Sequence, residues 1–282
     1  MSWKKKKNTK KGKKQKQIML LGCFALLILA LFVVVLFELF FSNKSYYKVS
    51  SRVSDVSMAK ESNNNENYQV VGWVKVQGTK LDMPILTGID DDSDFPVKME
   101  KYVWDVGGDG QFHNKINIMG HNIFNLSSQP KKSSDKFNRF EELMSFVYYD
   151  FAKDNKYIQV TINGKDYLYK VFSVDFIDAV DVDMFPNGEY SKDDIKYQID
   201  LFKNNSLYDY DIDVNENDSL VSLITCTRFF GSDKYIDFLV NGRLVRDGEK
   251  IDNYSVKKNQ SNYSEIENKL KGDGENESDS SM

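Results

Sequence analysis

The sequence has few of the residues that build metal centres and disulfide frameworks. Its 282 residues include only 2 cysteines, 2 histidines and 4 prolines. A closed zinc site takes four Cys or His ligands held together, and a disulfide scaffold needs several cysteine pairs. These counts exclude a disulfide-stapled scaffold and argue against zinc. The acidic run Asp90-Asp91-Asp92 with Asp94 is typical of a solvated loop, so we expect neither a metal ion nor a cofactor.

Acidic residues outnumber basic residues in all of the chain that follows the apolar run. Residues 1–16 contain nine lysines and no acidic residue, whereas residues 43–282 contain 29 basic and 41 acidic residues, a net charge of −12. Nucleic-acid binding requires a basic face, so nucleic acid is not an expected partner. Hydrophobic residues make up 41% and aromatic residues 13% of the chain, which is enough for a core and argues against a mostly disordered protein.

Only one segment is long and apolar. Residues 18–37 contain no charged residue, and twenty helical residues span about 30 Å, the thickness of a bilayer core. A cleaved signal peptide is the main alternative, but its apolar part is usually about 7–15 residues long and ends at a small-residue cleavage site. No such site follows in Glu38-Leu39-Phe40-Phe41. We therefore predict a transmembrane signal anchor over residues 18–41, and this segment would bind the membrane.

The lysines before the apolar run predict its orientation. Positive residues stay on the cytoplasmic side of a membrane span, so residues 1–17 are expected in the cytoplasm and the rest of the chain outside the cell. Residues 42–68 are polar and are expected to form an extracellular stalk with a helical stretch near 46–61. Residues 69–250 have the length of one domain, and the polar residues 251–282 are expected to be disordered.

The domain is predicted to be mainly β. The dipeptide Asn163-Gly164 between two alternating segments is a strong hairpin signal. Ser191 followed by Asp194 is a capping-box pattern, and Ile195, Ile199 and Phe202 then share one helix face. Strands are expected at 70–76, 81–86, 116–119, 157–162, 165–174 and 219–225, and residues 235–240 and 243–245 are expected to form a last strand. Helices are expected at 140–151 and 191–204. Many strands with a late helix suggest a closed β-barrel or a sandwich with helical additions.

Cys226 is the first candidate for chemistry. Cys23 lies in the apolar run, so Cys226 is the one thiol expected outside the membrane. A leftover thiol in an oxidising compartment indicates either intermolecular pairing or a reactive nucleophile, although a lone cysteine can also be a small buried residue at a strand end. Because a thiol with a pKa near 8.5 is only slightly ionised at pH 7, a nucleophile needs a base or a cation nearby.

The two histidines differ in context. His113 lies in a polar segment and is expected to be a solvated loop residue, whereas His121 follows Gly120 at the end of an apolar strand. A histidine in that position can be presented in a cleft. A Cys–His pair far apart in sequence, each at the end of a strand, is typical of a cysteine protease or transferase.

Four segments, in order, resemble the sortase family. Residues 71–85 resemble the opening of a sortase domain, Met119-Gly120-His121-Asn122 its histidine motif, Leu223-Ile224-Thr225-Cys226 its cysteine signature and residues 240–245 its closing strand. The resemblance covers about residues 70–245, and the helix at 191–204 is similar to the extra helix of class B sortases. It implies a closed eight-stranded sortase-type β-barrel preceded by one transmembrane helix, in a membrane-anchored transpeptidase of a Gram-positive surface.

The resemblance also implies a mechanism. Cys226 would cut a sorting signal of a surface protein or pilin, at the Thr–Gly or Thr–Asn bond of an LPxTG- or NPxTN-like motif, and form a thioester. An amine of a peptidoglycan precursor or a pilin lysine would then resolve the thioester, with His121 moving the protons. Cell-wall anchoring and pilus polymerisation share this chemistry. A hydrolytic cysteine peptidase on the same fold, or a catalytically inactive surface-binding module, are the alternatives.

One expected residue is missing. The family supplies an arginine near the start of the last strand to stabilise the oxyanion, and counting back five residues from Gly242 gives Asp237, an acid. The nearby cations are Arg228 and Lys234, with Arg243 in the closing motif. Arg228 comes two residues after Cys226, so on a continuing strand both side chains face the same way. We therefore predict the catalytic residues His121, Cys226 and Arg228, with Lys234 and Arg243 as the other candidates for the cation.

Overall fold

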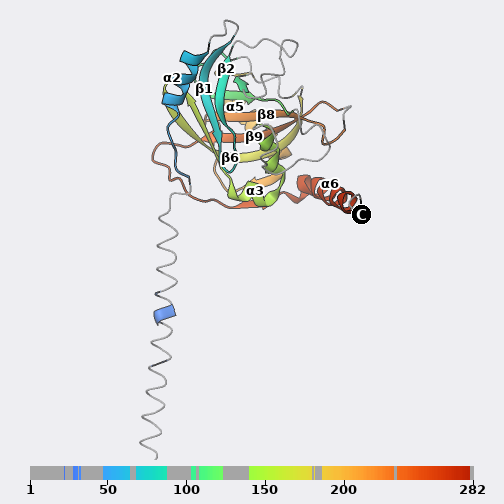
Figure 1. Ribbon diagram of the computed structural model, residues 1–282. Coiled ribbons are helices and arrows are strands. Elements are labelled where there is room, and N and C mark those ends of the chain that lie inside the picture. The colour runs from blue at the N-terminus through green and yellow to red at the C-terminus, as the bar shows by residue number, and fades with distance from the viewer. Residues whose placement is uncertain are drawn as a thin grey trace, which may run out of the picture. The chain divides into compact units, whose positions relative to one another are not determined.

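The computed structural model of the chain describes residues 22, 28–30, 32, 47–63, 68–87, 103–105, 108–122, 140–179, 181, 186–231 and 234–279 (Figure 1). It divides into two units, residues 1–46 and 47–282. In the first unit, the described residues are helical. Across the described residues, no helix combines the length and the hydropathy needed to cross a bilayer. Most of the predicted anchor at 18–41 lies outside the described residues, as does the acidic run at 90–94, so the anchor stays a prediction.

The second unit is built mainly from strands, as predicted. The strands of its principal sheet are β1 Gln69–Val76, β2 Asp82–Thr87, β3 Val103–Asp105, β4 Lys115–Met119, β5 Tyr157–Ile162, β6 Lys165–Asp178, β8 Leu220–Thr227 and β9 Ile236–Leu244. A small second sheet pairs β7 Tyr208–Tyr210 with β10 Val256–Lys258. The helices are α2 Val53–Ser62, the 3-10 helix η3 Phe140–Val147, α3 Tyr149–Asp154, α5 Lys192–Asn205 and α6 Gln260–Asp279.

The principal sheet pairs in the order β1-β2-β3-β4-β8-β9-β6-β5. Strand β1 also pairs with β5, from Gly72 opposite Ile162 to Val76 opposite Ile158, so the order of pairing returns to its start. The pairs β2–β3 and β4–β8 are parallel. The parallel β4–β8 pair matters for function, because it brings the ends of two strands that are far apart in sequence to the same edge.

Helix α5 covers one face of β6, β8 and β9. It begins after Ser191, whose hydroxyl accepts a hydrogen bond from the Asp194 amide at 3.3 Å, as the capping pattern predicts. Its apolar stripe packs on the sheet in a cluster that includes Phe172, Ile195, Ile199, Phe202, Leu220, Ile224 and Leu239. The same face of β8 continues to Cys226, because side chains alternate along a strand.

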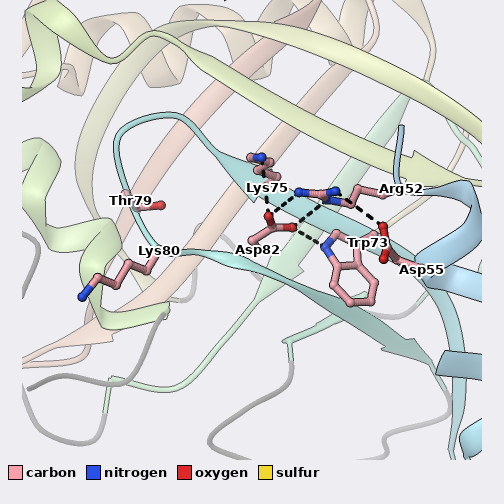
Figure 2. Close-up of a pocket in the computed structure, with 7 residues that line it drawn as sticks. All are labelled: Arg52, Asp55, Trp73, Lys75, Thr79, Lys80 and Asp82. Atoms are coloured by element: carbon pink, nitrogen blue, oxygen red, sulfur yellow. Dashed lines mark hydrogen bonds and ion pairs between the residues drawn. The ribbon is translucent and has the colours of Figure 1, made fainter. Parts of the chain in front are cut away.

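The segment predicted as a stalk is partly folded against the domain. Arg52 donates two hydrogen bonds to Asp82, at 2.9 Å and 2.6 Å, and the indole of Trp73 donates a third at 2.6 Å; Figure 2 shows Asp82 at the centre of these contacts. Helix α2 follows directly, and its buried Val56 packs with Val70 of β1. Residues 47–62 therefore belong to the folded unit, because their charged and apolar groups find partners on the β1–β2 hairpin.

The prediction of a disordered tail is contradicted by the structure. Residues Val256–Lys258 form β10, and α6 follows from Gln260. Tyr254, Tyr263 and Ile266 are buried, and the Tyr254 hydroxyl shares its one proton between the carbonyls of Lys156 and Val171, at 2.9 Å and 2.8 Å. The composition of the tail is polar, but its few large side chains are placed where they cover the domain.

Candidate functional site

The site begins at the ends of two parallel strands. In the β4–β8 pair, Met119 lies opposite Ile224. The Gly120 amide donates to the Ile224 carbonyl at 3.1 Å, so the alignment continues past the end of β4. Continuing this register by two residues brings His121 level with Cys226. Neighbouring strands lie about 4.8 Å apart. The imidazole and the thiol therefore lie on adjacent segments of the chain, where β4 and β8 end.

Two side chains hold the histidine segment on the cysteine strand. The Thr225 hydroxyl donates to the Gly120 carbonyl at 2.8 Å, and the Asn122 amide donates to the Cys226 carbonyl at 3.0 Å. Thr225 is fully buried and Asn122 is 2% exposed, so water does not compete for either bond. Gly120 is required here, since a Cβ atom at this position would overlap the ring of Phe140. These contacts give a structural role to the other residues of the two predicted motifs: Gly120 and Asn122 beside His121, and Thr225 beside Cys226.

Cys226 opens onto a cavity of about 230 Å³. Its side chain is exposed and takes part in no disulfide within the described residues. The cavity is lined by Ala179, Cys226, Thr227, Arg228, Lys234, Tyr235, Ile236 and Asp237. Tyr235 is 86% exposed, so the entrance to the cavity carries a large aromatic ring. An exposed thiol beside such a cavity can reach a carbonyl carbon of a bound peptide.

Asp237 lies directly across the sheet from Cys226. The β8–β9 register pairs these two residues, and Asp237 is 6% exposed. In the order β4-β8-β9, the cysteine strand lies between the strand that leads to His121 and the strand of Asp237. Two strand spacings are about 10 Å, so Asp237 adjoins the thiol and is not placed to orient His121. The thiol therefore has a possible base on one side and an acid residue on the other.

The structure separates the three candidate cations. Arg228 and Lys234 both line the cavity with Cys226. Arg243 pairs with Leu220, at the opposite end of the β8–β9 ladder from Cys226. It is 2% exposed and makes a two-pronged ion pair with Glu249. Arg243 is thus a structural residue of the closing strand. Arg228 and Lys234 remain as candidates for the cation that stabilises the oxyanion.

His113 is far from Cys226. It precedes β4, at the end opposite to His121. Its Nε2 lies 2.9 Å from an Asp109 oxygen and its Nδ1 lies 3.4 Å from a Glu189 oxygen. His113 lies outside the helices and strands, as predicted, but its side chain is only 20% exposed and has acidic neighbours, so it is not the solvated residue that we expected.

A buried polar row, missed in the sequence, crosses the sheet under α5. The Lys115 ammonium donates to the Ser222 hydroxyl at 2.5 Å, that hydroxyl donates to the Asn241 carbonyl oxygen, and the Asn241 amide donates to the Asp175 carboxylate at 2.5 Å. All four residues are at most 1% exposed. Burial lowers the pKa of Lys115 to about 7 and raises the pKa of Asp175 well above its ordinary value. No local pattern marks these residues as a group, because each belongs to a different strand and the row forms only where β4, β8, β9 and β6 pair.

Two other hollows among the described residues are lined by none of the candidate catalytic residues. The hollow drawn in Figure 2, of about 570 Å³, is lined by Arg52, Asp55, Trp73, Lys75, Thr79, Lys80 and Asp82. Its central charges already pair with each other. In the described part of the chain, no three His, Cys, Asp or Glu side chains are grouped so that they could hold a metal ion. The cavity beside Cys226 is therefore the candidate site: it holds the thiol and two cations, and the strand register brings His121 level with the thiol.

Comparison with known proteins leads to the sortases. No protein-family model matches the chain. Sortase B of Staphylococcus aureus (strain NCTC 8325 / PS 47) is 27% identical over 166 residues, which are 57% of this chain and 64% of that protein. The chain thus matches less than two thirds of the length of this curated relative.

Solved structures share the fold. Sortase B of Clostridium perfringens is 24% identical, with a TM-score of 0.50 over 69% of this chain and 98% of that one. The Staphylococcus aureus sortase B–substrate complex is 18% identical, with a TM-score of 0.52 over 69% and 85%. Sortase B from the type II pilus of Streptococcus pneumoniae is 17% identical, with a TM-score of 0.51 over 70% and 98%. The predicted sortase-like, mainly β fold is confirmed, and so is the predicted likeness to class B.

Proposed function

We propose that this chain, a sortase-family protein most like class B, is a cysteine transpeptidase that cuts a peptide bond and joins the acyl fragment to an amine. The placement of His121 and Cys226 at neighbouring ends of parallel strands carries the proposal. The hydrogen bonds of Thr225 to Gly120 and of Asn122 to Cys226 support it, because they hold the two reactive residues in one geometry. A nucleophile and a base held in this way are the minimum for acyl transfer.

The first half-reaction breaks the peptide bond. The Cys226 thiol gives its proton to His121, and the sulfur attacks the carbonyl carbon to form a C–S bond. The carbonyl oxygen becomes an oxyanion, which Arg228 at the cavity wall stabilises by a charge-assisted hydrogen bond. When the oxyanion collapses, the C–N bond breaks, and the imidazolium of His121 protonates the leaving amine. The product is a thioester on Cys226.

The second half-reaction regenerates the thiol. His121 takes a proton from the incoming amine, whose nitrogen attacks the thioester carbon. The C–N bond forms, the C–S bond breaks, and the sulfur recovers a proton from the imidazolium. We propose that the peptide is a C-terminal sorting signal of a surface protein or pilin, and that the amine belongs to a peptidoglycan precursor or a pilin lysine.

The location follows from the N-terminus. The apolar run at 18–37 and the nine lysines before it support a single-pass membrane protein with a cytoplasmic N-terminus and an extracellular domain. Protease added to intact cells stripped of their wall should then remove the domain and leave a small N-terminal fragment. A protected domain would show that the orientation is wrong.

The activity is tested with the full chain and quenched-fluorescent peptides that carry candidate sorting motifs. Cleavage with and without an added amine separates transfer from hydrolysis by water. Cys226→Ala should form no acyl-enzyme, and His121→Ala should lower the cleavage rate by several orders of magnitude. His113→Ala is the matched control, because His113 lies at the other end of β4, and it should stay near wild type. Turnover retained in Cys226→Ala would refute the proposal, and a wild-type chain inactive on every motif would favour a binding module.

A further inference from the structure

Asp237 gives the nucleophile an unusual neighbour. It is the cross-strand partner of Cys226, it lines the same cavity, and it is only 6% exposed. Directly opposite residues of an antiparallel pair have Cβ atoms about 4.5–5.5 Å apart. A carboxylate and a thiolate at this separation repel each other, and the charged form of the thiol is disfavoured.

Other charged or titratable groups line the cavity or lie beside it. Arg228 follows β8, and Lys234 precedes β9. His121 stands beyond Cys226 on the β4 side. On β6, Ile177 is the partner of Asp237, and Asp178 is the next residue along that strand. The two cations and a protonated His121 favour the thiolate, whereas Asp237 opposes it; Asp178 points to the other face of the sheet, because side chains alternate along a strand.

Distance and burial decide between these opposing effects. Arg228 and Lys234 are exposed, and long side chains in water hold their charge loosely and are screened by salt. Asp237 is held by the strand register against the residue that carries the thiol, and its carboxylate is mostly removed from water. A carboxylate at this distance lowers the ionisation constant of the thiol by roughly one to two orders of magnitude, if the effective dielectric constant lies between that of a protein surface and that of water.

We propose that Asp237 holds the Cys226 thiol in its protonated form in the resting protein, so that the thiolate arises only when His121 takes the proton during attack. This inference deepens the proposed function, since it assigns a control residue to the same site. The pair Cys226–His121 then works as a neutral thiol and a general base, rather than as a preformed ion pair.

Such control has a consequence for an exposed thiol. The thiolate, and not the thiol, is the form that reacts with oxidants and electrophiles. Cys226 is exposed, so keeping it protonated slows its loss to side reactions. The same carboxylate also destabilises the oxyanion of the reaction. Asp237 therefore lowers the rate of acyl transfer and, at the same time, slows the oxidation and alkylation of Cys226.

The test measures the ionisation of Cys226 without any peptide. The full chain carries Cys23→Ser in every sample, so that Cys226 is the only thiol, and its alkylation rate by iodoacetamide is followed by mass spectrometry between pH 5 and 10. In wild type the rate should rise around pH 8.5 or above, the range of an unperturbed or disfavoured thiolate. Asp237→Asn should move the midpoint down by about one pH unit, and so raise the alkylation rate at pH 7 by about tenfold.

Three comparisons make the result specific to the charge of Asp237. Asp237→Glu retains the carboxylate and should keep the wild-type midpoint. Asp209→Asn makes the same charge change at an exposed position of β7 and should not move the midpoint. If Asp237→Asn is poorly folded, Asp237→Gln against Asp237→Glu makes the same comparison with a longer side chain.

A midpoint that is unchanged or higher in Asp237→Asn would overturn the inference, as would a wild-type midpoint near pH 6. The outcome is independent of the peptide assay. A shifted midpoint in a chain that cleaves no peptide supports the inference and counts against transpeptidation. An unshifted midpoint in a chain that cleaves and transfers peptide overturns the inference and supports transpeptidation.

Discussion

Lys115 makes the stability of the domain depend on pH in an unusual direction. Its ammonium group is fully buried, 2.5 Å from the Ser222 hydroxyl and 5.4 Å from the centre of the Phe202 ring. Burial lowers the pKa of Lys115 from 10.5 to about 7. Between these two pH values the unfolded chain holds the proton and the folded chain releases it. The unfolded state then binds more protons, so the free energy of unfolding rises with pH.

The size of the effect follows from the two pKa values. A pKa difference of one unit corresponds to about 1.4 kcal/mol. Integrating the proton uptake from pH 7 to pH 9.5 gives a gain of about 3 kcal/mol for Lys115 alone. Other titrating groups also contribute to the pH profile of the wild type. Comparison with Lys115→Met removes them, because every other group is present in both proteins and the methionine fills a similar volume.

The assay is denaturant unfolding of both proteins, followed by tryptophan fluorescence at pH 7 and pH 9.5. The stability of wild type relative to Lys115→Met should improve by about 3 kcal/mol over this range. Lys196→Met is the control, since Lys196 lies on the exposed side of α5. Its hydrogen bond to Asp200 raises the pKa of Lys196, the opposite direction to the shift of Lys115. A difference between wild type and Lys115→Met that does not change with pH would refute the reasoning, because Lys115 would then remain charged in the folded state.

Two further predictions concern the cation of the site and the packing of α6. Arg228→Ala should slow peptide cleavage by about 10²–10³-fold, whereas Arg243→Ala should mainly lower stability, because Arg243 is buried in an ion pair; peptide-cleavage rates and unfolding curves of both variants check this. A wild-type rate in Arg228→Ala together with a collapse in Lys234→Ala would assign the cation to the segment before β9. Tyr263→Ala should lower the free energy of unfolding by about 2–4 kcal/mol because Tyr263 is 4% exposed, while Tyr235→Ala, at 86% exposure, should change it little. Equal stability of these two tyrosine variants would show that α6 is not docked.

Much of the fold could be predicted because its signals are local. The Asn163-Gly164 turn has positive φ values of 52° and 70°, the conformation that this dipeptide favours. Helix α5 begins where Ser191 can cap it. The predicted strands correspond to β1, β2, β4, β5, β6 and β8, and the predicted last strand corresponds to β9. Hydrophobic alternation and turn residues act within a few positions, so a single sequence carries this information.

The composition of the tail was misleading for a related reason. Tyr254, Tyr263 and Ile266 are isolated among polar residues, and a low average hydrophobicity is typical of disorder. Tyr254 is buried against Lys156 and Val171, which lie about 90 residues earlier in the chain, and Tyr263 packs against Tyr208. Average composition does not report whether a few large side chains have a surface to cover.

By itself, the sequence determined that the domain is mainly β and that one thiol and one histidine end two of its strands. Only the tertiary structure decided which residues meet. It ties the His121 segment to the Cys226 strand across 104 residues through Asn122, aligns Asp237 with Cys226, and moves Arg243 into a separate ion pair. The physical reason is that strand register and side-chain pairing are set by contacts between distant segments. Periodicity along the chain specifies which face a residue takes but not which residue lies opposite.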